Sequence, residues 1–408
     1  MTLLTPERTD VALGLIPLTD CAPLAVAVEL GFFEREGVRV TTSRERSWAA
    51  VRDKVAYGVL DGAQMIAPML LSTSLGVGGV RRSLVTGVAL SRNGNAITLS
   101  PVLAGAVEAA AGEAAPGDPL PADGVRGEAE RRREAGEPRL RFGVVFGGST
   151  HEFELRYWLA AGGVDPDRDV DLVVVPPPRM PSALGAGEVD GFCVGEPWNS
   201  VAVEAGFGRV AITKRQLRDG GPEKVLGVTE TWARRHPATH AALIRGVAAG
   251  AAWVQRPENR AQAAGILARP EYVGEPESVI VRSLTGRFRT GREAAGEAEP
   301  AGDDRFHLFG GLGVNRPDPG DALWFLLEML RWGMIARPID VAAVAASVFR
   351  PGLYDAALAR EAEPAPSGGA RFFDGRGLDP DRPLTYLEGC TLHHRRVELA
   401  DLAAAKAG

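Results

Sequence analysis

The stretch "LGLIPLTDCAPLAVAVELGFFEREG", Leu13 to Gly37, carries the pattern that decides the fold. The apolar run from Val11 to Leu18 predicts a buried strand. Thr19 and Asp20 then offer N-caps for a helix of roughly ten residues, which Gly31 stops. The sequence therefore predicts a first strand whose end directs a loop and a helix N-terminus toward a ligand.

The same stretch can also be compared with an export signal that ends in a lipid-modified cysteine, Cys21. The residues before the apolar run carry no positive excess, and Pro17 interrupts the run itself. Asp20 stands where a cleavage site needs a small residue. The sequence predicts instead that Cys21 is a small buried residue and that the chain is not exported.

Composition places the chain among ordinary globular proteins long enough for two domains. It has 408 residues, of which 45% are hydrophobic and 24% are charged, and no apolar run reaches the roughly 20 residues of a spanning helix. The formal charge of -6 disfavours direct binding to nucleic acid or to an anionic membrane. The three cysteines and six histidines lack metal-site or disulfide spacing, so we expect no metal, no cofactor and no disulfide framework.

Strand and helix patterns alternate over the first part of the chain. Strands are predicted at Val38–Ser43, around Ala63–Met65, in "SLVTGVAL" and in "NAITLS", with a helix in "SWAAVRDKVAYGVLDGAQM". This alternation predicts an α/β unit with a mostly parallel sheet.

A second α/β unit follows a change of composition. The Ala-, Gly-, Pro- and Glu-rich segment at 101–138 reads as a surface excursion with a solvated helix in "GEAERRREAGEP"; a partner-binding surface is the minority interpretation. Strands are then predicted in "RLRFGVVF", "VDLVVVPP" and "VDGFCVGEPW", and helices in "STHEFELRYWLAAGG" and "MPSALGAG". After Lys224 the pattern is mostly helical, with loops at Gly291–Asp304 and Glu361–Gly369.

Two strand-to-helix turns, at Thr19–Pro23 and Gly147–His151, present helix N-termini. Ser149 and Glu152 fit a capping box in the second turn. Such ends offer unpaired N–H donors and a partial positive charge, which suit a small anion. Because every α/β protein has such turns, this evidence alone is weak.

A series of motifs in a fixed order resembles a known family, the nitrate- and bicarbonate-binding proteins of the NrtA/CmpA type. The likeness runs from about Val11 to Glu388, apart from the excursion. The motifs are "GLIPLTDCAPLAVAVELGFF", "SW…RDKVAYGVLDGAQM…AP", "NGNAIT", "STHEFELRYWLAAGGVDPDRDV", "VVVPPPRM", "VDGFCVGEPWN", "PEKVLGV", "ARPEYV", "LWFLLEMLRWG" and "FFDGRGLDP".

The resemblance implies a two-lobed periplasmic-binding-protein fold of type II, α/β in class, with the ligand in the interlobe cleft. Residues 9–98 and 220–400 would form a discontinuous first lobe, and residues 99–219 the second lobe with the excursion at about 101–138. The strand-to-turn pattern fits this arrangement, because α/β sheets bind ligands at the carboxyl ends of their strands.

The resemblance also implies a set of ligand-binding residues: Trp48, Asn95, His151 and Lys224, with backbone at Pro177 and Gly195. Taken singly, Trp48 reads as core, Asn95 as a turn residue, His151 as a cap and Lys224 as a solvated side chain. Their occurrence together at family positions reverses that interpretation. Nitrate has three weak acceptor oxygens and needs several donors and one cation.

Two family details bear on the ligand. Asn95 stands where nitrate-transport members carry the longer Gln. The preference between nitrate and nitrite therefore stays open. Lys224 favours the nitrate branch over the calcium-associated bicarbonate branch, and no group of carboxylates stands out among the motifs for a hard cation.

A member that begins directly on its first strand resembles the cytoplasmic nitrate sensor of the NasS type. We therefore expect a cytoplasmic sensor that binds nitrate or nitrite and holds an RNA-binding antitermination regulator of the NasT type until ligand arrives. The first alternative is the substrate-binding component of a nitrate or bicarbonate ABC transporter. An enzyme of the same fold, like the thiamin-pyrimidine synthases, ranks third because no nucleophile–base spacing or cysteine cluster appears.

Overall fold

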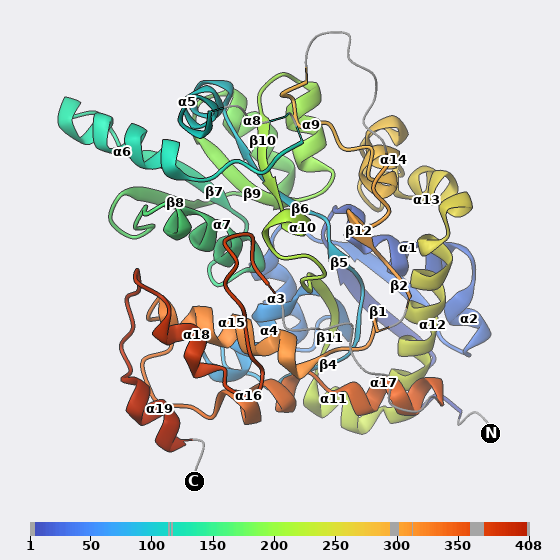
Figure 1. The fold of residues 1–408 in the computed structure, drawn as a ribbon. Coiled ribbons are helices and arrows are strands. Elements are labelled where there is room, and N and C mark those ends of the chain that lie inside the picture. Colours follow the sequence, from blue (N-terminus) through green and yellow to red (C-terminus); the bar gives the residue numbers. More distant parts are fainter. Residues whose placement is uncertain are drawn as a thin grey trace.

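The described strands form two five-stranded sheets and one short two-stranded pair (Figure 1). The computed structural model describes residues 5–112, 115, 117–293, 302–311, 313–359 and 371–405. In spatial order the first sheet contains β2 (Arg39–Arg44), β1 (Asp10–Leu15), β3 (Gly62–Ile66), β11 (Lys224–Thr229) and β4 (Leu84–Ala89). The second contains β10 (Arg209–Thr213), β6 (Asn95–Leu99), β9 (Gly191–Gly195), β7 (Leu140–Val144) and β8 (Val170–Val174). The short pair is β5 (Arg92–Asn93) with β12 (His307–Leu308).

Helices cover both sheets. Those before β6 are η1 (Thr19–Cys21), α1 (Ala22–Glu29), α2 (Phe32–Arg35), α3 (Trp48–Ala56) and α4 (Ala67–Leu75). Those between β6 and β11 are α5 (Pro101–Ala111), α6 (Asp123–Ala135), α7 (Thr150–Ala161), η2 (Pro177–Arg179), α8 (Met180–Gly185), α9 (Trp198–Glu204) and α10 (Lys214–Leu217). The remainder are α11 (Glu230–Arg235), α12 (Pro237–Gln255), η3 (Pro257–Asn259), α13 (Arg260–Leu267), α14 (Glu277–Thr285), α15 (Pro319–Arg331), α16 (Val341–Val348), α17 (Pro351–Leu358), α18 (Leu384–Glu388) and α19 (Leu399–Ala405).

Both sheets are mixed, so the prediction of a mostly parallel sheet is wrong. In the first sheet β1 runs parallel to β2 and β3, but β11 lies antiparallel between β3 and β4. In the second, β7 is parallel to β8 and β9, while β6 is antiparallel to β9 and β10. In the first sheet the reason is the return of the chain, which inserts β11 between β3 and β4.

The opening stretch forms β1, η1 and α1, but Thr19 and Asp20 do not cap the helix. Both lie within η1, and no side-chain cap bond is made there. The Thr19 hydroxyl instead donates to the carbonyl of Glu196, 3.1 Å away beyond the end of β9. Asp20 is turned into the interior, with 2% of its surface exposed. Burial of Cys21, which is 0% exposed, is confirmed.

The excursion at 101–138 contains two helices that pack on each other, α5 and α6. The charged run forms α6, as predicted, and Figure 1 shows this helix projecting from the body of the second sheet. Residues 294–301 of the loop predicted at Gly291–Asp304 lie outside the described residues, as does the whole loop predicted at Glu361–Gly369. The predicted capping box is only half formed: the Ser149 hydroxyl accepts the Glu152 N–H at 3.1 Å, but the Glu152 carboxylate accepts the Gly148 N–H at 2.6 Å instead of the Ser149 N–H.

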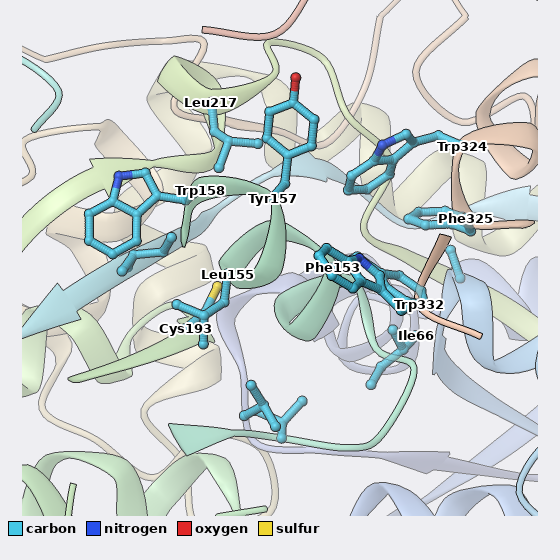
Figure 2. Packing of buried hydrophobic residues seen from close by; sticks show 14 of the residues in the cluster. Ile66, Phe153, Leu155, Tyr157, Trp158, Cys193, Leu217, Trp324, Phe325 and Trp332 are labelled. Atoms are coloured by element: carbon cyan, nitrogen blue, oxygen red, sulfur yellow. The ribbon is translucent and has the colours of Figure 1, made fainter. Parts of the chain in front are cut away.

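One hydrophobic core runs through both sheets and holds them against each other. It joins Met65 of β3 to Phe142 and Phe192 of the second sheet. Figure 2 shows Phe153 of α7 directed toward the aromatic side chains of the α15 segment. The Phe153 and Trp324 rings lie edge to face with centroids 6.4 Å apart, a favourable aromatic geometry. This contact joins α7, which belongs to the second-sheet unit, to α15, which follows β11 in the chain.

The two sheets suggest where the chain crosses between lobes. β6 begins at Asn95 and belongs to the second sheet, whereas β4 and β11 belong to the first. We propose that the crossings lie next to β6 and between β10 and β11, so that the first lobe is discontinuous in sequence.

Candidate functional site

Polar side chains from both sheets meet in the interior and form what we call the charge cluster. Each member is at most 3% exposed. The members come from η1, β3, β6, α7, α10 and β11 with the residue before it; they are Asp20, Gln64, Asn95, His151, Glu154, Lys214, Glu223 and Lys224. Three of the six predicted residues, Asn95, His151 and Lys224, belong to this cluster.

Lys224, the first residue of β11, lies between two carboxylates. Its Nζ is 3.0 Å from Asp20 Oδ2 and forms a second ion pair with Glu223. It also lies 5.3 Å from the centroid of the Trp48 ring, a cation–π distance. Burial acts to lower the pKa of Lys224, but the attraction of Asp20 and Glu223 raises it above its ordinary value. The lysine is therefore a fixed positive charge in the interior.

Glu223 connects the two lysines of the cluster. Its Oε2 accepts hydrogen bonds from Lys214 Nζ at 2.6 Å and from Asn95 Nδ2 at 2.7 Å. Its Oε1 faces Lys224 and lies 3.4 Å from His151 Nε2. Burial acts to raise the pKa of Glu223, but Lys214 and Lys224 outweigh this and lower the pKa below its usual range. Glu223 therefore stays ionised.

Glu154 of α7 forms the second-sheet side of the cluster. Its carboxylate is 2.8 Å from Lys214 Nζ and accepts from Asn95 Nδ2 at 3.0 Å. Burial raises the pKa of Glu154, and Lys214 partly opposes this. Lys214 also donates to the Pro222 carbonyl at 2.7 Å, so its position is set by three protein acceptors.

His151 and Trp48, beside Glu223 and Lys224, carry buried nitrogens without a hydrogen-bond partner. Among the described residues this holds for both ring nitrogens of His151 and for the indole nitrogen of Trp48, and both side chains are at most 1% exposed. Burial lowers the pKa of His151 to about 3, so the ring is neutral and one nitrogen is a donor. Buried donors without partners are uncommon and call for an explanation such as a ligand.

Gly195 and Pro177, predicted through their backbone, are placed differently. Gly195 is the partner of Asn95 in the β6–β9 ladder. A Cβ built on Gly195 would lie 3.2 Å from Asn95 Oδ1 and 3.5 Å from Asp20 Oδ2, so the absence of a side chain leaves room beside the cluster. Pro177 is buried at the start of η2, and its carbonyl accepts the Met180 N–H; its role in binding stays a prediction.

Five members of the cluster were missed from sequence: Asp20, Gln64, Glu154, Lys214 and Glu223. Three of the five are carboxylates, which did not stand out among the motifs as a site for a hard cation. They come from elements far apart in sequence, and each is paired with a lysine, so the set does not form an oxygen cage for a hard cation. The available signals were Glu223 beside Lys224 and Glu154 one turn after His151.

The chemistry of the cluster fits binding rather than nucleophilic catalysis. The buried Cys193 thiol has a pKa raised well above its ordinary value, chiefly by burial, so it stays protonated and unreactive. Outside the cluster, Asp165, Asp167 and His394 could together offer metal ligands. Arg156, however, already pairs with Asp167 at 2.8 Å, and His394 with Asp165 at 3.0 Å.

Among the described residues, no helix combines the length and apolar character that crossing a membrane requires.

Comparison with known proteins gives matches along most of the chain. The model of the NMT1-like family matches residues 4–268. The chain is 38% identical over 404 residues to the nitrate import ATP-binding protein NrtC of Synechocystis sp. (strain ATCC 27184 / PCC 6803 / Kazusa), covering 97% of this chain but only 57% of that protein. The chain thus spans little more than half the length of this relative.

Two further comparisons cover most of both chains. The nitrate/nitrite binding protein NrtA of Synechococcus elongatus (strain ATCC 33912 / PCC 7942 / FACHB-805) is 33% identical over 400 residues, covering 94% of this chain and 86% of that protein. The crystal structure of the periplasmic nitrate-binding protein NrtA from Synechocystis PCC 6803 superposes with a TM-score of 0.86 at 30% identity, covering 95% of this chain and 100% of that one. The two-lobed binding-protein fold predicted from the motifs is thereby confirmed.

Proposed function

Because the chain belongs to the NMT1-like family, and within it to the solute-binding proteins related to NrtA rather than to enzymes, we propose that it binds nitrate or nitrite at the charge cluster. The observation that carries this proposal is the meeting of Lys224 and Trp48 from the first-sheet unit with Asn95 and His151 from the second. A small anion there would contact both lobes at once.

The chemistry of the cluster supports a planar oxyanion. Lys224 supplies a full positive charge, and the unpartnered nitrogens of Trp48 and His151 supply N–H donors. Nitrate oxygens are weak acceptors, so several donors around the edge and one cation are the requirements. A neutral His151 donates a hydrogen bond without adding a second positive charge.

We further propose that the chain is a cytoplasmic sensor, in which binding of the anion changes the affinity for a partner protein. An anion that touches both lobes favours the closed arrangement by its differential affinity. Contacts between the lobes support a closed arrangement of this kind: Thr19 N–H donates to the Glu196 carbonyl at 2.8 Å, and Trp198 Nε1 donates to the Pro17 carbonyl at 2.9 Å. An antitermination regulator of the NasT type that binds only the open form would be released by nitrate or nitrite.

The net charge agrees with that division of roles. A formal charge of -6 leaves contact with RNA to the regulator, since RNA binding needs a positive surface. By linkage, regulator and anion must weaken each other's binding by the same factor.

The test is size-exclusion chromatography of this protein mixed with a NasT-type regulator encoded near it. We expect a complex without anion and separate proteins under saturating nitrate or nitrite, while chloride at equal ionic strength leaves the complex intact. A complex that persists with saturating anion, or that never forms without it, contradicts the sensor role.

A second candidate function is favoured by the match to NrtC, in which nearly the whole chain aligns with part of an ATP-binding transport protein. In this alternative the cluster still binds the anion, but the closed form of the two lobes acts on a nitrate or bicarbonate ABC transporter as its substrate-binding component. Anion-dependent stimulation or inhibition of a cognate transporter's ATP hydrolysis, with no effect on any antitermination regulator, would favour it.

A further inference from the structure

The cluster already provides Lys224 with anions of its own. Asp20 and Glu223 both pair with its ammonium group, and the Trp48 ring lies against it. An entering nitrate or nitrite therefore does not meet a free cation. It must take the place of a carboxylate, and the identity of that carboxylate follows from what each would lose.

Glu223 has other positive and donor groups to hold it. Lys214 Nζ is 2.6 Å from Glu223 Oε2, and the Asn95 amide donates to the same oxygen at 2.7 Å. Asp20 is less well supported, because the other donor to its carboxylate among the described residues is the Gln64 amide. Gln64 is itself fixed by the Ile16 N–H, which donates to its Oε1 at 2.8 Å.

Total charge sets the consequence of this exchange. Three buried carboxylates and two buried lysines leave the cluster with one excess negative charge when all are ionised. Adding an anion would leave two excess negative charges out of contact with water, which is strongly unfavourable. A carboxylate that loses its cation in such surroundings takes up a proton instead.

We propose that nitrate or nitrite replaces Asp20 at Lys224, and that Asp20 takes up one proton from solvent in the same step. The exchange is a deeper account of the proposed anion site and rests on it. No covalent bond of the anion changes; the Asp20 carboxylate and one solvent proton become a carboxyl group, which can donate a hydrogen bond where a carboxylate could only accept.

The charged groups that act on Asp20 are Lys224 and Glu223 of the β11 segment, and the Cys21 thiol lies beside it on its own element. His151 and Glu154 of α7, Lys214 of α10 and Cys193 of β9 act on Glu223. Glu196, just beyond β9, has a pKa that burial raises to about 7 and accepts from the Ser200 hydroxyl at 2.6 Å; the Asp20→Asn variant below separates its proton from that of Asp20. Glu223 keeps Lys214, and Glu154 keeps both Lys214 and Asn95. Burial alone already raises the pKa of Asp20 while Lys224 opposes it, so loss of that lysine removes the opposing influence.

Calorimetry tests the proposal directly. Nitrate, which takes up no proton itself near neutral pH, is titrated into the full chain in buffers of different ionisation enthalpy. We expect uptake of about one proton per anion, and an affinity that falls about tenfold per unit as pH rises from about 6 to about 8. Binding with no proton uptake and a flat pH dependence overturns the proposal while leaving the anion site in place; no binding of nitrate or nitrite at all overturns both.

Two variants identify the group. Asp20→Asn should bind with no proton uptake, a flat pH dependence and an affinity above that of the parent at about pH 8. Asp10→Asn, which removes an exposed carboxylate paired with Arg39, should retain the uptake of the parent. A folded Asp20→Asn that still takes up a proton, or that binds no anion, overturns the assignment; should this variant fail to fold, the measurements on the parent chain decide alone.

Discussion

Replacing Lys224 by Met should destabilise the fold strongly at neutral pH and much less in acid. Lys224 is fully buried, and Asp20 would lose its cation while keeping, among the described residues, the Gln64 amide as its donor. An isolated buried carboxylate protonates rather than remaining charged. Protonating it at pH 7, about three units above the ordinary aspartate pKa, costs at most about 4 kcal/mol of unfolding free energy.

The sign of the pH dependence follows from the raised folded-state pKa of Asp20. Unfolded Asp20 ionises above about pH 4, whereas in the folded variant it must stay protonated, so the deficit grows as pH rises. At about pH 5 the upper limit on this loss of unfolding free energy falls to about 1.5 kcal/mol. The estimate agrees with the roughly 3–5 kcal/mol typical of breaking a buried ion pair by removing one partner.

Urea unfolding of the variant and its parent at about pH 5 and about pH 7.5 measures this deficit. Arg39→Met is the control, because its pair with Asp10 is exposed on both sides and exposed ion pairs contribute little to stability. The double variant Asp20→Asn with Lys224→Met should regain most of the loss. A deficit that is equal at both pH values, or a double variant no better than Lys224→Met, would refute the reasoning.

Three other substitutions separate binding from folding. His151→Phe should abolish nitrate binding in calorimetry while the thermal midpoint changes little, because its ring nitrogens form no hydrogen bond among the described residues. Since burial lowers the pKa of His151 to about 3, this side chain should contribute no pH dependence between about pH 5 and pH 8. Full affinity in the variant contradicts its role. Gly195→Ala should weaken binding at least about tenfold in the same titration, because its Cβ would press on Asn95 Oδ1 at 3.2 Å; unchanged affinity would remove Gly195 from the site. Glu328→Gln weakens the buried acceptor of the hydrogen bond that Trp332 Nε1 donates at 2.7 Å. It should lower the free energy of unfolding by about 1–3 kcal/mol in chemical denaturation and leave anion affinity within about twofold. A larger loss of affinity would link α15 to the site.

The elements of the fold were predictable where a periodic pattern is local. The strand and helix of the opening stretch agree with the prediction, as does the helix predicted in "STHEFELRYWLAAGG", which is α7. β11 was not predicted, because the chain after Lys224 was interpreted as mostly helical, although the turn residues Asp219 to Pro222 precede the short apolar run "KVLGVT". Its insertion between β3 and β4 depends on partners distant in sequence, and this is why the mixed character of the sheets was missed.

The candidate site was predictable only through the family likeness. Lys224, Asn95 and His151 were predicted because they lie in recognisable motifs, and the structure brings all three into the charge cluster. Asp20 was interpreted as a helix cap, since Asp before a helical pattern is the usual cap. Its actual partner, Lys224, lies 204 positions later, at an Nζ–Oδ2 distance of 3.0 Å. Such ion pairs leave no mark in local sequence.

Isothermal titration of the purified chain with nitrate, nitrite and bicarbonate, the last with and without calcium, tests the central claim most directly. We expect saturable binding of one nitrate or nitrite per chain, and a loss of more than about tenfold in affinity in Lys224→Ala, because the anion then lacks its full counter-charge. Binding of bicarbonate alone, or nitrate affinity unchanged in a folded Lys224→Ala, would contradict the account.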